Sequence, residues 1–137
     1  MSDVVVDASV WVSRLVAGDV QHVRCQAWFQ TQAEQGGLLI APVLVLAEIA
    51  GAIARRTGQP ELAEAAVRQV QRLPGLRLVP LDANLAKLAA GLAGRHSLRG
   101  ADAVYVAAAH RLQVPLVTLD DEQLRRGRAV VTTLEPD

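Results

Sequence analysis

The sequence contains few aromatic residues, a single cysteine and a single lysine. Aromatic residues make up 3% of the 137 residues, so a core has to be built from Val, Leu, Ile and Ala. Cys25 is the only cysteine, which excludes an intramolecular disulfide and a cysteine-rich zinc site. Lys87 is the only lysine. The other basic side chains are arginines, which suit bidentate phosphate contacts but equally reflect a compositional bias of the genome.

Net charge and long apolar runs are also absent. Basic and acidic residues number 14 each, so the formal net charge is zero and no overall field attracts nucleic acid. The longest apolar stretch, Leu38 to Ala54, is shorter than a typical membrane span. Pro42, Glu48 and Gly51 interrupt it, so we expect no membrane helix. The start, Met1-Ser2-Asp3, lacks the basic segment of a signal peptide, and we expect a cytoplasmic protein.

Hydrophobic residues make up 51% of the chain, enough for one domain, which we expect to span residues 1–137. Strands are predicted at Val4–Val6, Leu38–Ala41, Leu76–Pro80, Leu116–Leu119 and Ala129–Thr132. Helices are predicted over Ala8–Ala17, Val20–Gln35, Pro42–Thr57, Glu61–Leu73, a segment capped by Asp82 that ends near Arg95, and Ala101–Leu112. This alternation predicts an α/β fold. We expect a compact α/β/α sandwich around a central, mainly parallel sheet of four to five strands, with Val4–Val6 central.

Four carboxylates occur at the edge of, or inside, segments that otherwise have the composition of a buried core. They are Asp7, Glu48, Asp102 and Asp120. Burial of a charge is costly unless the charge is paired or binds a metal. Because no equally placed base accompanies these acids, the missing partner is predicted to be a divalent cation. Ligands that are all oxygen favour a hard ion such as Mg²⁺ or Mn²⁺.

Each acid alone also has an ordinary explanation. Asp7 could cap a helix, and Asp102 could complement a helix dipole. Asp120, followed by two further acids, could belong to a solvated turn. Glu48 could form an ion pair with an arginine, but the nearest candidates, Arg55 and Arg56, lie two helical turns away rather than one.

The four acids together are more specific than any one of them. A two-metal site needs several carboxylates that converge from different segments on two ions roughly 3.5–4 Å apart. In parallel sheets such sites form beyond the carboxyl ends of the strands, where Asp7 and Asp120 are predicted to lie. Ser9 and Thr118, two residues from these acids, could orient the carboxylates or bound water. Their alternative roles are helix capping and an ordinary strand hydroxyl.

Four segments in this order resemble the PIN-domain ribonucleases, and most closely the compact toxins of the VapC type. The segments are Val4-Val5-Val6-Asp7-Ala8-Ser9, Leu46-Ala47-Glu48-Ile49, Arg99-Gly100-Ala101-Asp102-Ala103 and Leu116-Val117-Thr118-Leu119-Asp120. The resemblance covers nearly the whole chain. It implies a small parallel-sheet α/β/α fold, Mg²⁺ or Mn²⁺ dependence, and cleavage of RNA with Asp7, Glu48, Asp102 and Asp120 as the acidic cluster. Asp121 is a candidate substitute for Asp120.

The resemblance further implies a homodimer and an inhibitory antitoxin encoded nearby. Arg95 and Arg99 are candidate contacts to RNA phosphates, although a plain charged surface explains them equally well. Two other functions are kept open. One is a catalytically inactive PIN fold that binds RNA or protein. The other is a Mg²⁺-dependent aspartate phosphatase, whose nucleophile usually has a second aspartate two residues on, where this chain has Ser9.

Overall fold

The computed structural model describes residues 3–137, so the expectation for Met1 and Ser2 lies outside the described residues. Five parallel strands form one sheet in the order β3-β2-β1-β4-β5. The strands are β1 (Val4–Val6), β2 (Leu39–Pro42), β3 (Leu76–Val79), β4 (Leu116–Val117) and β5 (Thr133–Leu134). The predicted fold class is confirmed, with β1 at the centre of the sheet. The register places Val5 opposite both Ile40 of β2 and Leu116 of β4.

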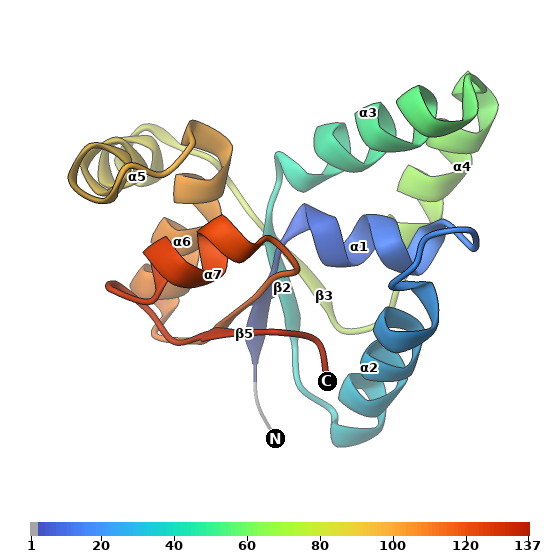
Figure 1. Cartoon of the computed structure of the whole chain (residues 1–137), viewed down its shortest axis with the longest axis horizontal. Coiled ribbons are helices and arrows are strands. Elements are labelled where there is room, and N and C mark those ends of the chain that lie inside the picture. Colours follow the sequence, from blue (N-terminus) through green and yellow to red (C-terminus); the bar gives the residue numbers. More distant parts are fainter. Residues whose placement is uncertain (1–2) are drawn as a thin grey trace.

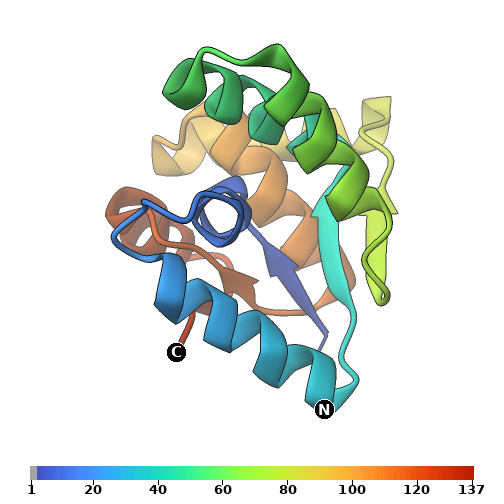
Figure 2. The ribbon, with the colours of Figure 1, turned by 90° about the vertical axis from the view of Figure 1, so that its right-hand side faces the viewer.

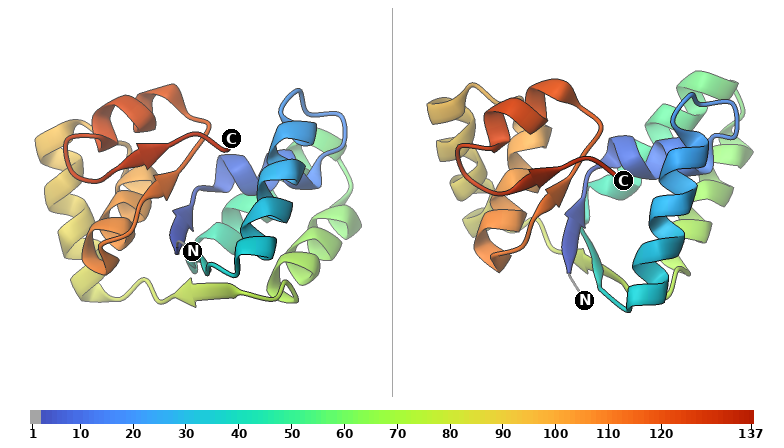
Figure 3. Two further views of the ribbon diagram at one scale, coloured as in Figure 1. Left: turned by 90° about the horizontal axis from the view of Figure 1, so that it is seen from below. Right: turned by 60° about the horizontal axis from the view of Figure 1, so that its bottom comes forward.

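Helices flank the sheet on both sides, as Figures 1 and 3 show. The helices are α1 (Ala8–Leu15), α2 (His22–Gln35), α3 (Val45–Thr57), α4 (Pro60–Gln71), α5 (Ala83–His96), α6 (Gly100–Leu112) and α7 (Asp121–Gly127). The first four lie to one side of the strands and the last three to the other (Figure 1). Figure 2 shows α1 seated at the end of β1, with α2 running beside it. None of the helices in residues 3–137 is both long and apolar enough to cross a membrane.

The core is aliphatic with a small aromatic cluster. Helix α6 is buried along its whole middle, from Ala103 to Ala109, because it packs against β1 and β2 while α5 and α7 cover it. This explains why its sequence is apolar on every side. Trp11, Trp28 and Phe29 are buried, and the ring centroid of Phe29 lies 4.7 Å from that of Trp11 and 5.0 Å from that of Trp28. These aromatic residues are therefore part of the core.

Two predicted elements are wrong in position, and one helix was not predicted. Pro42 ends β2 instead of opening a helix, because the Val43 N–H donates to the Val79 carbonyl and extends the pairing with β3. Helix α7 occupies the segment after Asp120 that was predicted as a turn at most. Residues 128–132 then form a turn, with the Val130 and Val131 N–H groups bonded to the Gly127 carbonyl. The last strand therefore begins at Thr133 instead of Ala129.

Candidate functional site

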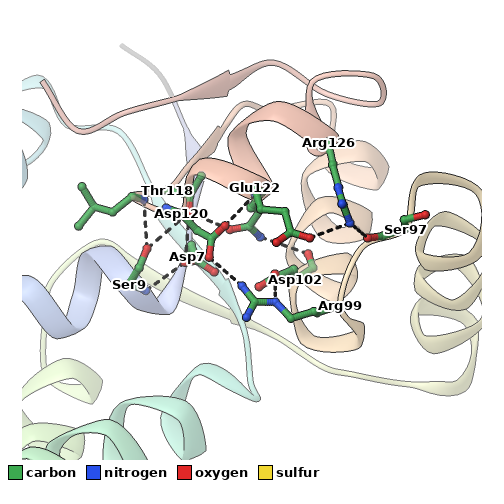
Figure 4. Close-up of polar contacts among 11 residues, drawn as sticks. Asp7, Ser9, Ser97, Arg99, Asp102, Thr118, Asp120, Glu122 and Arg126 are labelled. Atoms are coloured by element: carbon green, nitrogen blue, oxygen red, sulfur yellow. Dashed lines mark hydrogen bonds and ion pairs between the residues drawn. The ribbon is translucent and has the colours of Figure 1, made fainter.

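The four predicted acids come from four different elements at the carboxyl edge of the sheet. Asp7 directly follows β1, and Asp120 follows the neighbouring strand β4. Asp102 lies in the first turn of α6, and Glu48 lies in the first turn of α3, the helix that follows β2. Figure 4 shows Asp7, Asp102 and Asp120 directed toward one another. The parallel register of β1, β2 and β4 thus brings together residues that are far apart in the sequence.

Asp7 is the most buried of the four acids, with 5% of its surface exposed. Its Oδ2 accepts hydrogen bonds from the Ser9 N–H at 3.1 Å and the Thr118 hydroxyl at 3.2 Å. Burial raises the pKa of Asp7, and the charge of Asp120 raises it further, while the hydrogen bonds from Ser9 and Thr118 oppose the shift. Asp7 Oδ2 therefore caps α1 and also bonds to the segment that follows β4.

A buried polar network holds the loop that follows β4. The Thr118 hydroxyl, which is fully buried, contacts Gln123 Oε1 at 2.7 Å and accepts from the Asp120 N–H at 3.1 Å. Ser9 Oγ lies 3.4 Å from the Thr118 hydroxyl and accepts from the Leu119 N–H at 3.1 Å. These two hydroxyls join the start of α1 to the end of β4. The orienting role predicted for Ser9 and Thr118 is consistent with these contacts.

Asp102 and Asp120 are joined by the guanidinium of Arg99 (Figure 4). Arg99 Nε donates to Asp102 Oδ2 at 3.2 Å, and Nη2 donates to Asp120 Oδ2 at 2.8 Å. Burial and the charge of Asp7 raise the pKa of Asp102, while the charge of Arg99 opposes the shift. The Arg99 side chain is 66% exposed, so this cation lies at the mouth of the site.

Glu48 has a partner that the sequence analysis did not identify. The hydroxyl of Tyr105, a residue that is fully buried, donates to Glu48 Oε1 at 2.6 Å. Burial raises the pKa of Glu48, the Tyr105 hydrogen bond lowers it, and the charges of Asp7 and Asp102 raise it. The arginine considered as an ion-pair partner, Arg56, instead contacts Asp19 at 2.7 Å.

Two of the candidate residues lie outside this cluster. Asp121 is exposed on the first turn of α7, whereas its neighbour Asp120 bonds to Arg99 and raises the pKa values of Asp7 and Asp102. The geometry therefore favours Asp120 over Asp121. Arg95 is exposed in the last turn of α5, one turn before the loop that carries Arg99.

The sequence analysis missed Tyr105 and Gln123. Tyr105 follows Asp102 by three residues, a helical spacing that places both on one face of α6. Gln123 follows Asp120 by three residues, the spacing of a capping box. Its N–H donates to Asp120 Oδ1 at 2.8 Å and its amide donates to the Asp102 carbonyl at 3.2 Å, so it links α7 to α6. Both spacings were visible signals in the sequence.

The donor set suits a hard divalent cation, although within residues 3–137 no three acidic, histidine or cysteine side chains form a ready-made metal cage. All the candidate donors are carboxylate oxygens. The negative charge of Asp7 contributes to the raised pKa values of Glu48 and Asp102, so these acids repel one another. Arg99 already places one positive charge between Asp102 and Asp120. A second positive charge among the acids would relieve the remaining repulsion.

A parallel sheet with acids gathered at its carboxyl edge defines an α/β protein with a candidate metal-binding centre. Residues 4–129 match the PIN domain family, so the chain belongs to that family. A search of curated proteins finds no match.

Several solved structures share the fold. VapC20 of Mycobacterium tuberculosis, described as a sarcin-ricin loop cleaving toxin, has a TM-score of 0.79 at 22% identity, with 91% of this chain and 95% of that chain covered. VapBC2 of Rickettsia felis, solved with a DNA fragment from its promoter, has a TM-score of 0.73 at 14% identity over 98% of both chains. FitAcB of Neisseria gonorrhoeae has a TM-score of 0.71 at 18% identity over 97% of both chains. At these identities the likeness establishes the fold.

Proposed function

We propose that the protein is a metal-dependent endoribonuclease and the toxin of a toxin–antitoxin pair. The observation that carries the proposal is the convergence of Asp7, Glu48, Asp102 and Asp120 from four elements onto one edge of the sheet. Membership of the PIN domain family and the likeness to VapC20, described as a sarcin-ricin loop cleaving toxin, support it. The complete set of acids favours an active enzyme over an inactive binding module.

In this proposal Asp7, Asp102 and Asp120 hold Mg²⁺ or Mn²⁺, and Glu48 completes the catalytic cluster. The cation, when bound, supplies Lewis-acid activation of water and of the phosphodiester. Ser9 and Thr118 keep Asp7 and the loop before Asp120 in place, through the bonds described above. Tyr105 fixes the rotamer of Glu48 and holds its carboxylate charge toward the site. Arg95 and Arg99 are proposed to contact RNA phosphates at the mouth of the site.

The first prediction is that RNA cleavage requires both the acids and a divalent cation. Asp7→Asn keeps the size and capping ability of residue 7 but removes a ligand charge, so cleavage should fall by orders of magnitude. Total RNA is incubated with the purified chain in Mg²⁺, Mn²⁺ or EDTA, and the new ends are mapped by sequencing. Asp82→Asn is the matched control, because Asp82 is an exposed helix cap outside the acidic cluster. Full activity of Asp7→Asn, or unchanged cleavage in EDTA, would contradict the proposal.

The second prediction concerns an antitoxin that occupies a groove between α1 and α3. A hollow of about 570 Å³ has small apolar walls that include Ala8, Val12 and Ala52, and it extends from Glu48 to Arg55. Such a groove suits the apolar face of a helix, and the solved structures that share the fold include a toxin–antitoxin complex from Klebsiella pneumoniae. Growth arrest caused by the chain should be relieved by the gene encoded beside it, and the two products should copurify.

Ala52→Trp fills this groove at a half-buried wall position and should weaken that complex while RNA cleavage is retained. Ala65→Trp, at an exposed position of α4 outside the groove, is the matched control. A chain that is harmless when expressed alone, with no partner gene beside it, contradicts the toxin assignment but not the nuclease. The homodimer that the resemblance implies is checked by light scattering of the purified chain, with and without the partner.

A further inference from the structure

Arg99 places one positive charge against two of the acids in the structure, Asp102 and Asp120. Its side chain spans two of them, through the bonds to Asp102 Oδ2 and Asp120 Oδ2 at 3.2 and 2.8 Å. It is the residue that caps α6, three positions before Asp102, so it reaches the acids from the same helix start that carries one of them. A planar guanidinium carries several N–H donors in a fixed geometry, so it can donate to two carboxylates at once.

We propose that Arg99 is a built-in placeholder for the metal: it joins Asp102 and Asp120 in the metal-free protein and is displaced into solvent when a divalent cation binds between them. The inference rests on the proposed function in one respect only, namely that these acids are ligands of the metal. What the inference adds is that a side chain of the protein itself, Arg99, competes with the metal for the site. The protein should therefore bind metal more weakly than its acids alone would allow.

Arg99 and a bound metal would compete for the same two carboxylates. Arg99 engages Oδ2 of both acids, and the other oxygen of Asp120, Oδ1, already accepts from the Gln123 N–H. A metal held by Asp102 and Asp120 would therefore compete with Arg99 for Oδ2. It would also repel a guanidinium held within a few Å of it, because like charges at that distance interact strongly outside bulk water. Arg99 must therefore release at least one acid as the metal enters.

The structure also allows Arg99 to move without disturbing the fold. Its side chain is 66% exposed, and its backbone is extended with φ −64° and ψ 150°. The loop beneath it is held separately, because Arg126 donates to the Ser97 carbonyl and pairs with Glu122 at 2.7 Å (Figure 4). The guanidinium can thus turn toward solvent while the start of α6, with Asp102, stays in position.

The first test measures Mn²⁺ affinity by calorimetry at pH 7.5, which needs no RNA and no activity. Arg99→Gln removes the competitor and should tighten Mn²⁺ binding about three- to tenfold, the range expected when two exposed ion pairs no longer have to break. Arg125→Gln is the charge-matched control, since Arg125 is exposed on α7 and has no ion pair within the described residues. Arg99→Lys keeps the charge but not the fork, and its affinity should fall between those of Arg99→Gln and wild type. Equal or weaker binding by Arg99→Gln than by Arg125→Gln overturns the inference.

The second test observes the displacement directly. The Nε–Hε signal of Arg99 is assigned in an NMR spectrum by its loss in Arg99→Gln. Addition of Mg²⁺ should move this signal to the position of a free arginine, with the same midpoint as a Mg²⁺ binding isotherm measured by calorimetry. A signal that stays in place while the site saturates overturns the inference.

The two tests separate this inference from the proposed function. If the wild type cuts no RNA but Mg²⁺ still releases Arg99, the nuclease assignment fails and the placeholder stands. If RNA is cut in a Mg²⁺-dependent way but Arg99→Gln and Arg125→Gln bind Mn²⁺ equally, the placeholder fails and the nuclease stands. Arg99→Lys serves in both tests if Arg99→Gln does not fold.

Discussion

Glu48 and Tyr105 form the contact that ties the acidic cluster most directly to the core. Tyr105 is fully buried in α6, and its hydroxyl reaches Glu48 at the start of α3. Burial raises the pKa of Glu48, and the Tyr105 hydrogen bond opposes that rise. The raised pKa means that the ionised carboxylate destabilises the fold. This penalty is absent below the unfolded pKa and is fully present once the pH has risen above the folded pKa.

Tyr105→Phe removes only the hydroxyl, so it tests this contact without creating a large cavity. The folded pKa of Glu48 should rise further, and the free energy of unfolding at pH 7 should fall by about 1–2 kcal/mol, because a carboxylate loses its donor. The difference from wild type should shrink at a pH below the folded pKa of Glu48, where the carboxyl is neutral. Urea unfolding at pH 7 and pH 4 measures both effects. In a Glu48→Gln background the cost of Tyr105→Phe at pH 7 should be smaller, and an equal cost would show that Glu48 is not the partner that matters.

Helix α7 shows how one side chain can serve both a helix and a site. Asp120 caps α7 through the Gln123 N–H at 2.8 Å, and its other oxygen bonds to Arg99. Asp82 caps α5 in the same way, through the Leu85 N–H at 2.8 Å, but lies outside the acidic cluster. The two caps therefore allow the helix-capping and the charge contributions of an aspartate to be separated.

Asp120→Asn and Asp120→Ala should differ in stability but not in metal binding. Asparagine caps a helix about as well as aspartate, whereas alanine costs about 1 kcal/mol. Both variants lack the charge, so both should bind Mn²⁺ far more weakly than the wild type. At α5, Asp82→Ala should lower the free energy of unfolding by a similar amount, and Asp82→Asn should lower it little. Mn²⁺ binding should be unchanged in both variants. Chemical denaturation and calorimetry give the readouts, and equal stabilities of the two Asp120 variants would exclude a capping role.

At the scale of the whole molecule, the acids oppose the fold that brings them together. The pKa values of Asp7, Glu48 and Asp102 are all raised, in each case by burial first and then by the charge of another acid in the cluster. Without metal, the fold therefore loses stability as the pH rises through the folded pKa values of these carboxyls. A metal bound at the proposed site would stabilise the folded state, because the unfolded chain has no assembled site.

Asp102→Asn should accordingly melt higher than the wild type in EDTA at pH 7.5 and lower in excess Mg²⁺. The wild type should gain about 2.7 kcal/mol at a Mg²⁺ concentration a hundredfold above its dissociation constant, and the variant should gain much less. Thermal melts of both proteins in EDTA and in Mg²⁺ measure how the order of their melting temperatures changes with metal. If Asp102→Asn melts lower in EDTA and Mg²⁺ shifts both proteins equally, the acids do not share a metal.

Local signals in the sequence determined the alternation of strands and helices, and hence the parallel α/β fold with β1 at its centre. The caps at Asp7 and Asp82 and the glycines at Gly36 and Gly58, which adopt φ values of 73° and 68°, mark helix ends that depend on neighbouring residues alone. Helix α7 and the position of β5 were not predicted. The start of α7 has a local signal in the Asp120–Gln123 cap, which was overlooked, whereas the position of β5 depends on its long-range pairing with β4.

The identity of the candidate acids was accessible from the sequence because a charge inside an apolar segment is rare whatever the fold. Their partners were decided only by the tertiary structure. Asp120 and Asp121 are equivalent in a list of residues, but the end of β4 directs Asp120 toward Arg99 and leaves Asp121 exposed on α7. Glu48 meets Tyr105 across 57 residues of sequence because α3 and α6 both begin at the same edge of the sheet. Such contacts depend on strand order and register, which local sequence patterns do not encode.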